Sequence, residues 1–422
     1  MSILKSIKEN AAGRKMAGNY VSLLFIQAAN ILLPLILLPY LVRTLGVEKY
    51  GLVLLAQSFC TILYVFVEFG FNLSATRRIS ILKDNASEKS QVFSAVISIK
   101  LLLAVAVAVV YAIIILAFPR FRLEWEVYAL SYGVVVGQAL FPDWFFQGIE
   151  KMQFIAILNV LAKIIFTALI FIFVREVGDY SNVPLFTSIG FLIAGTISFI
   201  ISLKFVKLIK PSKKMMGELM TESKSIFVSN IAARLFNSAN VFIVGMIAGD
   251  AIAGIYGSFE KIFMAAKGFF SPIMQAVFPW LSVQDEAKRR ASIRKMAPFI
   301  ILLASVFVTI ILIFGGDILQ LLFDDPAITA YTTAFKILCT ATVFAGLNML
   351  ILTLYLPAVG AYVKRMNILL IGGVLNVLLA CLLVSIWPIY GIVIAVVFTE
   401  LALALLSWVY FFKQSKPQTY AV

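Results

Sequence analysis

The sequence predicts an all-α integral membrane protein with twelve transmembrane helices in two six-helix halves. Of the 422 residues, 62% are hydrophobic and only 13% are charged, and the mean hydropathy is +1.01. Soluble domains average about 45–50% apolar and about 25% charged residues. Twelve long apolar segments, and a repeat that relates the two halves of the chain, complete this prediction.

The twelve apolar segments are each long enough to form a spanning helix, which needs about 20 residues to cross a roughly 30 Å hydrocarbon core. In order, they are 19–42, 50–73, 91–118, 126–147, 153–175, 184–208, 225–249, 253–280, 297–316, 328–357, 366–386 and 389–412. The stretch before the first segment is basic and polar, with no small-residue cleavage site after a short apolar region. We therefore expect an uncleaved first span and not a signal peptide.

The loops between the segments alternate in charge. The two ends of the chain and every second loop are rich in Lys and Arg, whereas the opposite loops hold more acids than cations. The positive-inside rule then predicts that both termini lie in the cytoplasm.

An internal repeat relates the two halves of the chain. Gly46 and Gly249 lie 203 positions apart, as do Gly51 and Gly254, and each glycine pair within a half brackets the short loop after its first span. With small gaps, KMQFIAILNV, which begins at Lys151, aligns with RMNILLIGGVLNV of the second half. Parallel repeats are a transporter architecture, with the binding site between the halves near the membrane midplane.

The repeat predicts the domain organisation. We expect an N-terminal six-helix lobe at 1–210, a cytoplasmic linker at 211–224 and a C-terminal six-helix lobe at 225–422. The linker lies within the longest cytoplasmic connection, 204–224, which falls near the middle of the chain.

Four cations are predicted at a similar depth inside the membrane. They are Arg234, Lys267, Lys100 and Lys163, and Glu400 is the one clear acid of this layer. A charge at the bilayer centre costs about 2.5–3.5 kcal/mol on insertion scales, so such residues face protein or a cavity. Each lysine alone could instead extend its ammonium group to the interface. Four cations with one acid predict a central cationic cavity, without carboxylate partners, for an anionic substrate.

The seventh segment strengthens this prediction with a polar stripe. Asn230, Arg234 and Asn237 follow the spacing of three and four that places residues on one helix face. We expect these side chains, with the three lysines, to bind substrate. Phosphate or diphosphate suits an arginine fork and a lysine point charge.

Several other functions are disfavoured by the composition. Histidine is absent, and the three cysteines, Cys60, Cys339 and Cys381, lie in apolar segments, where they are expected to be buried. No catalytic constellation, phosphate loop, metal site or cofactor is predicted. The net charge of +14 is spread over the chain, so nucleic acid is not an expected partner. Energy then comes from a gradient, and Glu400 and Asp143 are candidate proton carriers.

Two motifs resemble a known family. FPDWFFQGIEKM at 141–152 and LVRTLGVEKYG at 41–51 are similar to segments of O-antigen flippases of the Wzx type. The resemblance covers nearly the whole chain. It implies membership of the multidrug/oligosaccharidyl-lipid/polysaccharide exporter superfamily, which includes the MATE drug exporters and the lipid II flippase.

The resemblance implies a fold and a function. The fold would be two six-helix lobes in a V that alternate between inward-open and outward-open states. The substrate would be an undecaprenyl-diphosphate-linked oligosaccharide, moved from the cytoplasmic to the periplasmic leaflet of the bacterial inner membrane, with its diphosphate on Arg234 and Lys267. Within the first motif, gating is expected of Asp143, Trp144, Gln147 and Glu150. Membrane lipid is a further partner, and polymerase and chain-length regulator proteins are candidates that the sequence leaves open.

Two alternatives remain. A cation-coupled MATE-like multidrug exporter would favour acids in the cavity, where this sequence places cations. A membrane O-antigen polymerase or ligase would carry a large outer loop with catalytic residues, whereas the outer loops predicted here are roughly ten residues long.

Overall fold

A computed structural model of the chain describes the backbone of residues 11–82 and 85–413. Side chains are described from residue 29 onward, except those of residues 30, 31, 83, 84, 225, 229, 230, 232–238 and 414–422. The described residues form helices and short connections, without a β-strand.

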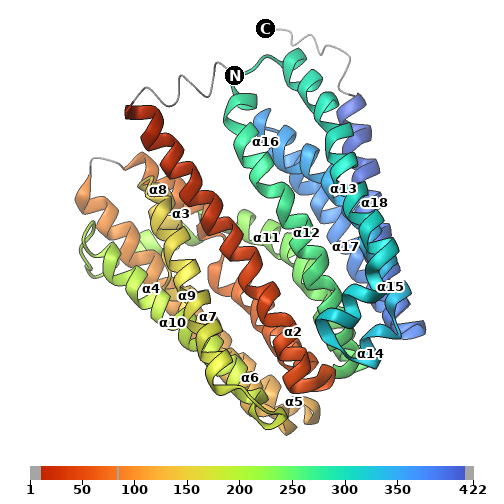
Figure 1. Ribbon diagram of the computed structural model, residues 1–422. Helices are drawn as coiled ribbons and strands as arrows, with labels where there is room; N and C mark the ends of the chain where they lie inside the picture. Colours follow the sequence, from red (N-terminus) through yellow and green to blue (C-terminus); the bar gives the residue numbers. More distant parts are fainter. Residues whose placement is uncertain (1–10, 83–84, 414–422) are drawn as a thin grey trace.

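The chain forms two groups of helices (Figure 1). The first helix group consists of α2 (Ala11–Glu68), α3 (Phe71–Ile81), α4 (Ala86–Ala117), α5 (Pro119–Leu123), α6 (Trp125–Ser131), α7 (Gly133–Leu140), α8 (Asp143–Gly148), α9 (Met152–Phe173), η1 (Val177–Ser181) and α10 (Asn182–Ser202). The second helix group consists of α11 (Lys213–Ala248), α12 (Asp250–Ser282), α13 (Glu286–Phe323), α14 (Pro326–Thr329), α15 (Thr332–Asn348), the π-helix η2 (Met349–Tyr355), α16 (Leu356–Ala358), α17 (Tyr362–Ile386) and α18 (Pro388–Lys413).

The predicted all-α membrane fold is confirmed, but the count of twelve spans is not. Within the described residues, nine helical segments are long and apolar enough to cross a membrane. Two predicted spans lie within α2, which is two helices joined at a kink at the non-helical residue Gly46. The predicted span 126–147 is broken into α6, α7 and α8, and its second break lies at Phe141, which is extended before Pro142. A residue before proline disfavours helical geometry.

The two glycines that the repeat pairs first have the same role in the structure. Gly46 (φ 72°, ψ 164°) interrupts α2, and Gly249 (φ 93°, ψ 171°) separates α11 from α12. These backbone angles are essentially restricted to glycine. Each glycine therefore turns the chain between two long helices at the corresponding place in its half.

The second glycine pair forms a close contact between the helix groups. A Cβ atom on Gly51 would lie 1.8 Å from the carbonyl oxygen of Asp250, and one on Gly254 would lie 1.9 Å from that of Val47. Asp250 and Val47 are themselves 203 positions apart. The contact is thus reciprocal, as expected for two halves related by a two-fold pseudo-symmetry. Absence of a side chain lets α2 and α12 touch backbone to backbone.

The helix groups meet at the end of the molecule that holds these glycines and diverge toward the opposite end (Figure 1). Both the start of α2 and the end of α18 lie at the diverging end. We call the first end the closed end and the second the terminal end.

Residues 211–224, the expected linker, include the start of α11, which packs against the first helix group. Arg78 of α3 forms ion pairs of 3.1 Å with Glu218 and 2.7 Å with Glu222. Ser74 and Ser223 share a hydrogen bond of 2.6 Å between their hydroxyl oxygens. The opening turns of α11 therefore fix the connection between the two groups.

The expected burial of the cysteines holds for two of the three. Cys60 and Cys339 are buried, whereas Cys381 is exposed on α17. That prediction was wrong for Cys381 because an apolar segment of a membrane protein also has a face toward lipid.

Candidate functional site

The second helix group contains a buried ion pair. The Nζ atom of Lys267 on α12 lies 2.8 Å from Oε1 of Glu400 on α18. The amide nitrogen of Asn348 on α15 donates to Oε2 of Glu400 at 2.6 Å and to its main-chain oxygen at 3.0 Å. Glu400 is 2% exposed. The expectation of a Lys267 without a carboxylate partner is therefore wrong, because three helices converge on one acid that the sequence places far from it.

An open pocket of about 270 Å³ lies beside this ion pair. Its polar lining includes Lys267, Glu400, Asn348 and Arg365. Arg365, in the first turn of α17, donates from Nε to the carbonyl oxygen of Leu352 at 2.7 Å. The pocket thus holds two cations and one carboxylate, and it reaches from the ion pair toward the terminal end of α17.

The π-helix η2 forms part of the wall of the same pocket. Met349 and Leu352, in the first turn of η2, line the pocket together with Thr353. The wider turn of a π-helix frequently occurs at functional sites. Here it places a main-chain carbonyl where Arg365 binds it.

A narrow extension of this polar region continues deeper into the second helix group. It is lined by Asn240, Tyr256, Glu260 and Asn376 as well as by the ion pair. Tyr256 donates its hydroxyl to Glu260 at 2.9 Å. Both amide atoms of Asn376 are buried without a hydrogen-bond partner among the described residues.

The first helix group has a polar pocket of its own, with a volume of about 200 Å³. Of the predicted site residues, Asp143 lines this pocket and Lys100 lies next to it. Glu68, Gln138, Asp143 and Asn159 line it. Lys100 lies behind this lining, fully buried, with Nζ 3.3 Å from the carbonyl oxygen of Gln138. The charges of Asp143 and Glu68 act on Lys100. Lys100 is therefore placed among carboxylates inside its own helix group and is not exposed to an open cavity as expected.

The repeat relates the two pockets. The alignment of 151–160 with 365–377 pairs Asn159 with Asn376. Asn159 lines the pocket of the first helix group, and Asn376 lines the polar region of the second. Each half thus carries a polar region that contains one lysine and at least one acid.

Lys163 is the one predicted lysine that approaches the other helix group. It lies half-buried on α9, and the charge of Lys261 on α12 acts on it. Lys261 is exposed. Lys163 of the first helix group is therefore close enough to Lys261 of the second for their charges to repel.

The remaining predicted site on α11 lies outside the described side chains. Asn230, Arg234 and Asn237 belong to the helix, but the positions of their side chains are not described. Their role in binding stays a prediction.

The aromatic residues of the motif at 141–152 are buried, and some of its polar residues are exposed. Trp144 is 1% exposed, its carbonyl oxygen accepts a hydrogen bond of 3.0 Å from Thr76, and Gly148 packs against Ile79. The aromatic residues therefore join α8 to α3 and α4, whereas Gln147, Glu150 and the apolar Met152 are accessible.

The closed end is held by two arginines of the first helix group. Arg43 donates from Nε to the carbonyl oxygen of Leu322 at 2.9 Å. Arg120 forms an ion pair of 2.8 Å with Asp250 and also donates to the carbonyl oxygen of Gly245. Sequence reasoning missed both contacts, because a cation in a short loop carries no signal of the distant group that it binds.

The polar residues of the pockets could have been found in part. Asn376 and Asn348 are polar residues inside apolar segments, and this is a usable signal. Arg365 opens a helix and looks like an ordinary interfacial charge, so only the tertiary structure connects it with Lys267.

Comparisons with known proteins agree with this architecture. Two curated relatives are both proposed O-antigen transporters. The protein of Escherichia coli (strain K12) is 28% identical over 388 residues, which cover 90% of this chain and 93% of the relative. The protein of Shigella dysenteriae is 28% identical over 394 residues, which cover 92% of this chain and 98% of the relative.

Solved structures show the same fold at low sequence identity. A lipid II flippase, MurJ, in an inward closed conformation has a TM-score of 0.71 at 14% identity, covering 93% of this chain and 88% of that one. An inward-facing multidrug resistance MATE family transporter of the MOP superfamily has a TM-score of 0.67 at 13% identity, covering 94% of this chain and 96% of that one. The model of one sequence family, described as "Polysaccharide biosynthesis protein", matches residues 16–285, which is more than half of the chain. The chain therefore belongs to the polysaccharide biosynthesis protein family.

Proposed function

We propose that this protein is a flippase that moves a lipid-linked polysaccharide precursor across the bacterial inner membrane. The observation that carries the proposal is the pocket beside Lys267 and Glu400, where two cations and one acid lie inside an apolar helical bundle. A site of this charge suits a phosphate-bearing group. The relatives named as O-antigen transporters favour an undecaprenyl-diphosphate-linked O-antigen unit as the substrate.

The two helix groups act in this proposal as lobes, with residues 1–210 and 225–422 joined through 211–224. Both termini lie in the cytoplasm, so the terminal end is the cytoplasmic entrance. Divergence of the groups at that end (Figure 1) and the contacts at the closed end support a substrate entry from the cytoplasmic leaflet. Arg234 and Lys163 contribute to substrate binding in this proposal, and Asp143, Gln147 and Glu150 act at the entrance.

Lys267 and Glu400 link substrate binding to proton binding in this proposal. A diphosphate that binds the Lys267 ammonium group competes with the Glu400 carboxylate for it. Glu400 would then be a buried carboxylate with Asn348 as its described partner. Such a charge is costly, and taking up a proton removes the cost. Binding of substrate and binding of a proton thus favour each other.

A multidrug exporter of the MATE type is less well supported. The helix arrangement is compatible with it, but the pocket of the second helix group carries an excess of cations, which does not suit a cationic drug. A polymerase or ligase is also disfavoured, because the relatives are named as transporters.

Complementation tests the proposal. The gene is expressed in a strain that lacks its O-antigen flippase, and surface polysaccharide and lipid-linked intermediates are measured, the latter by mass spectrometry. We expect restored surface polymer and loss of the accumulated intermediate, and we expect neither with Lys267→Ala or Arg234→Ala. Restored polymer in both variants would contradict the assigned cations. No restoration by the wild-type chain, with the protein present in the membrane, would contradict the function.

A further inference from the structure

A basic surface lies at the terminal end of the first helix group, outside the pockets described so far. The segment that follows α10 is KFVKLIKPSKK, and its lysines Lys204, Lys207, Lys210, Lys213 and Lys214 are all exposed. In the part of the chain that the structure describes, these five side chains have no ion pair. Their charge is thus available to a ligand.

Two of these lysines line an open pocket of about 440 Å³. Lys204 and Lys207 border it together with Ser87 and Ser90 of α4. The backbone of the segment is held in place, since the amide of Lys207 donates to the Ser90 hydroxyl at 3.1 Å and the amide of Ile209 donates to that of Ser94 at 3.0 Å. The pocket is therefore built on a spanning helix and not on a loose loop.

A second pocket of about 330 Å³ shares a wall with the first. Phe205 lines both pockets. On the second side, Lys89 and Lys151 are the cations, and Nζ of Lys151 lies 4.2 Å from the centre of the Phe205 ring. The two pockets that share Phe205 thus contain four lysines, with Glu150 as the acid of the second pocket.

Exposed apolar side chains accompany the charges. Leu203, Leu208 and Ile209 are 38%, 53% and 37% exposed, and they alternate with the lysines. Because the segment begins directly after the spanning helix α10, it lies at the membrane surface. A soluble phosphate would use the lysines but not the apolar side chains, whereas a phospholipid uses both.

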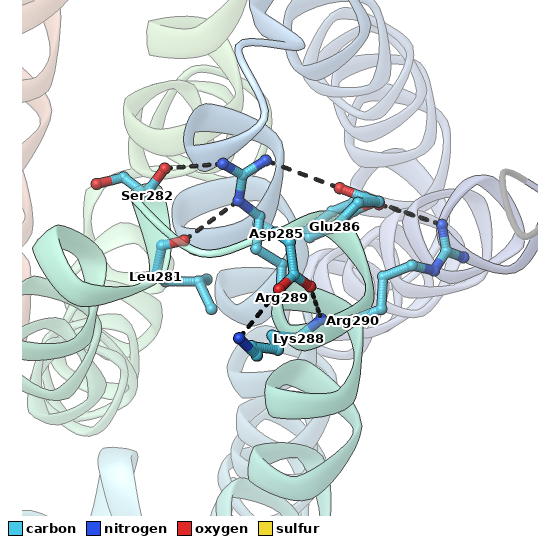
Figure 2. A network of polar contacts seen from close by, with 8 residues as sticks. Leu281, Ser282, Asp285, Glu286, Lys288, Arg289 and Arg290 are labelled. Atoms are coloured by element: carbon cyan, nitrogen blue, oxygen red, sulfur yellow. Dashed lines mark hydrogen bonds and ion pairs between the residues drawn. The ribbon is translucent and has the colours of Figure 1, made fainter. Parts of the chain in front are cut away.

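A second basic cluster, at the start of α13, differs from these lysines because its cations are paired within the chain. At the start of α13, Asp285 and Glu286 pair with Lys288, Arg289 and Arg290 (Figure 2). Arg289 also donates to the carbonyl oxygens of Leu281 and Ser282, at 3.2 Å and 2.8 Å. Those cations are paired within the chain, whereas the lysines after α10 form no ion pair with any other described residue. Orientation in the membrane requires positive charge on a loop, but it does not require that the charge lines a pocket.

We propose that the pocket formed by Ser87, Lys204 and Lys207 binds the headgroup of an anionic phospholipid, with Leu208 and Ile209 against the start of its acyl chains. Clusters of lysines beside a spanning helix attract anionic lipid. The phosphate accepts hydrogen bonds from the two ammonium groups. This lipid stays bound at the terminal end of the first helix group, away from the pocket of Lys267.

Lipid retention in a neutral detergent tests this site. The full-length protein is mixed with phosphatidylglycerol or phosphatidylcholine, and bound lipid is counted by native mass spectrometry. We expect retention of phosphatidylglycerol by the wild type and about 30-fold weaker binding by Lys204→Gln/Lys207→Gln. The matched control is Lys213→Gln/Lys214→Gln, which removes the same charge from the same segment outside the pocket and should bind as the wild type does.

Three outcomes would overturn the proposal. They are equal retention of both lipids, an equal loss in the two pair variants, and full displacement of the lipid by millimolar inorganic phosphate, which would identify a free-phosphate site. If Lys204→Gln/Lys207→Gln unfolds early, Lys204→Arg/Lys207→Arg decides the matter, because it keeps the charge and must retain phosphatidylglycerol. Since no flipping activity enters this assay, its result is independent of the proposed function.

Discussion

Gly51 of α2 and Gly254 of α12 lie against each other's helix backbone at the closed end, in a reciprocal contact between positions that the sequence repeat pairs. A side chain at either position would meet a carbonyl oxygen at less than 2 Å. The two helices can therefore approach in this way only while both residues remain glycine.

We expect Gly51→Ala to force α2 and α12 apart. Overpacking of a tight contact costs about 1–3 kcal/mol, so the melting temperature in detergent should fall and surface polysaccharide should decrease in the complementation assay. Gly217→Ala is the control, since an added Cβ meets nothing within 4 Å there. A Gly51→Ala variant as stable and active as Gly217→Ala would show that the contact is dispensable.

The Lys267–Glu400 pair allows structural and transport roles to be separated. Removing one partner of a buried pair costs about 3–5 kcal/mol, because the other charge is left uncompensated. Lys267→Met should therefore be unstable, and Lys267→Met/Glu400→Gln should recover much of the loss. Thermal unfolding in detergent measures both.

Transport should not recover in the same double variant. If Lys267 binds the diphosphate, a stable protein without this ammonium group still fails to export polymer. Normal surface polysaccharide from Lys267→Met/Glu400→Gln would assign the pair to structure alone.

The Arg120–Asp250 ion pair should help to hold the two helix groups together at the closed end. Its side chains are 35% and 28% exposed, so the pair contributes at most about 1 kcal/mol. We expect Arg120→Asp to raise the accessibility of a cysteine placed at Val47 to a membrane-impermeant thiol reagent, because like charges then face each other. The exchange Arg120→Asp/Asp250→Arg should reduce that accessibility again, and failure to do so would argue against a direct ionic contact.

The start of α13 should contribute a pH-dependent stability. Asp285 accepts a hydrogen bond of 2.8 Å from the amide of Lys288. This bond, and then the Lys288 side chain, holds the pKa of Asp285 below its usual range. A lowered folded-state pKa stabilises the protein above the ordinary aspartate value of about 3.9. The contribution is then lost as the pH falls through the lower folded value.

Asp285→Asn should remove this dependence. Asparagine still caps a helix, so the melting temperature near pH 7 should change little. Its decline between about pH 5 and pH 3 should be shallower than in the wild type. An unchanged decline would mean that other carboxylates govern the acid transition.

Much of the fold could be predicted because the membrane imposes it. The length of the apolar segments, the charge of the loops and the repeated glycines each reflect a local requirement of a spanning helix or of a turn. Helix ends were harder to predict than helices. Span 126–147 breaks before Pro142, because the residue before a proline disfavours helical geometry. The start of α11 at Lys213 depends on tertiary contacts, since Glu218 and Glu222 bind Arg78.

The sequence by itself determined which residues are costly in a membrane, and so it found Lys100, Lys267 and Glu400. Only the tertiary structure decided how that cost is met. Lys267 finds Glu400 from a helix 133 positions away, and Lys100 is enclosed among the first helix group's own polar residues. Burial can be inferred from one position and its neighbours, but a charge partner is set by how distant helices pack.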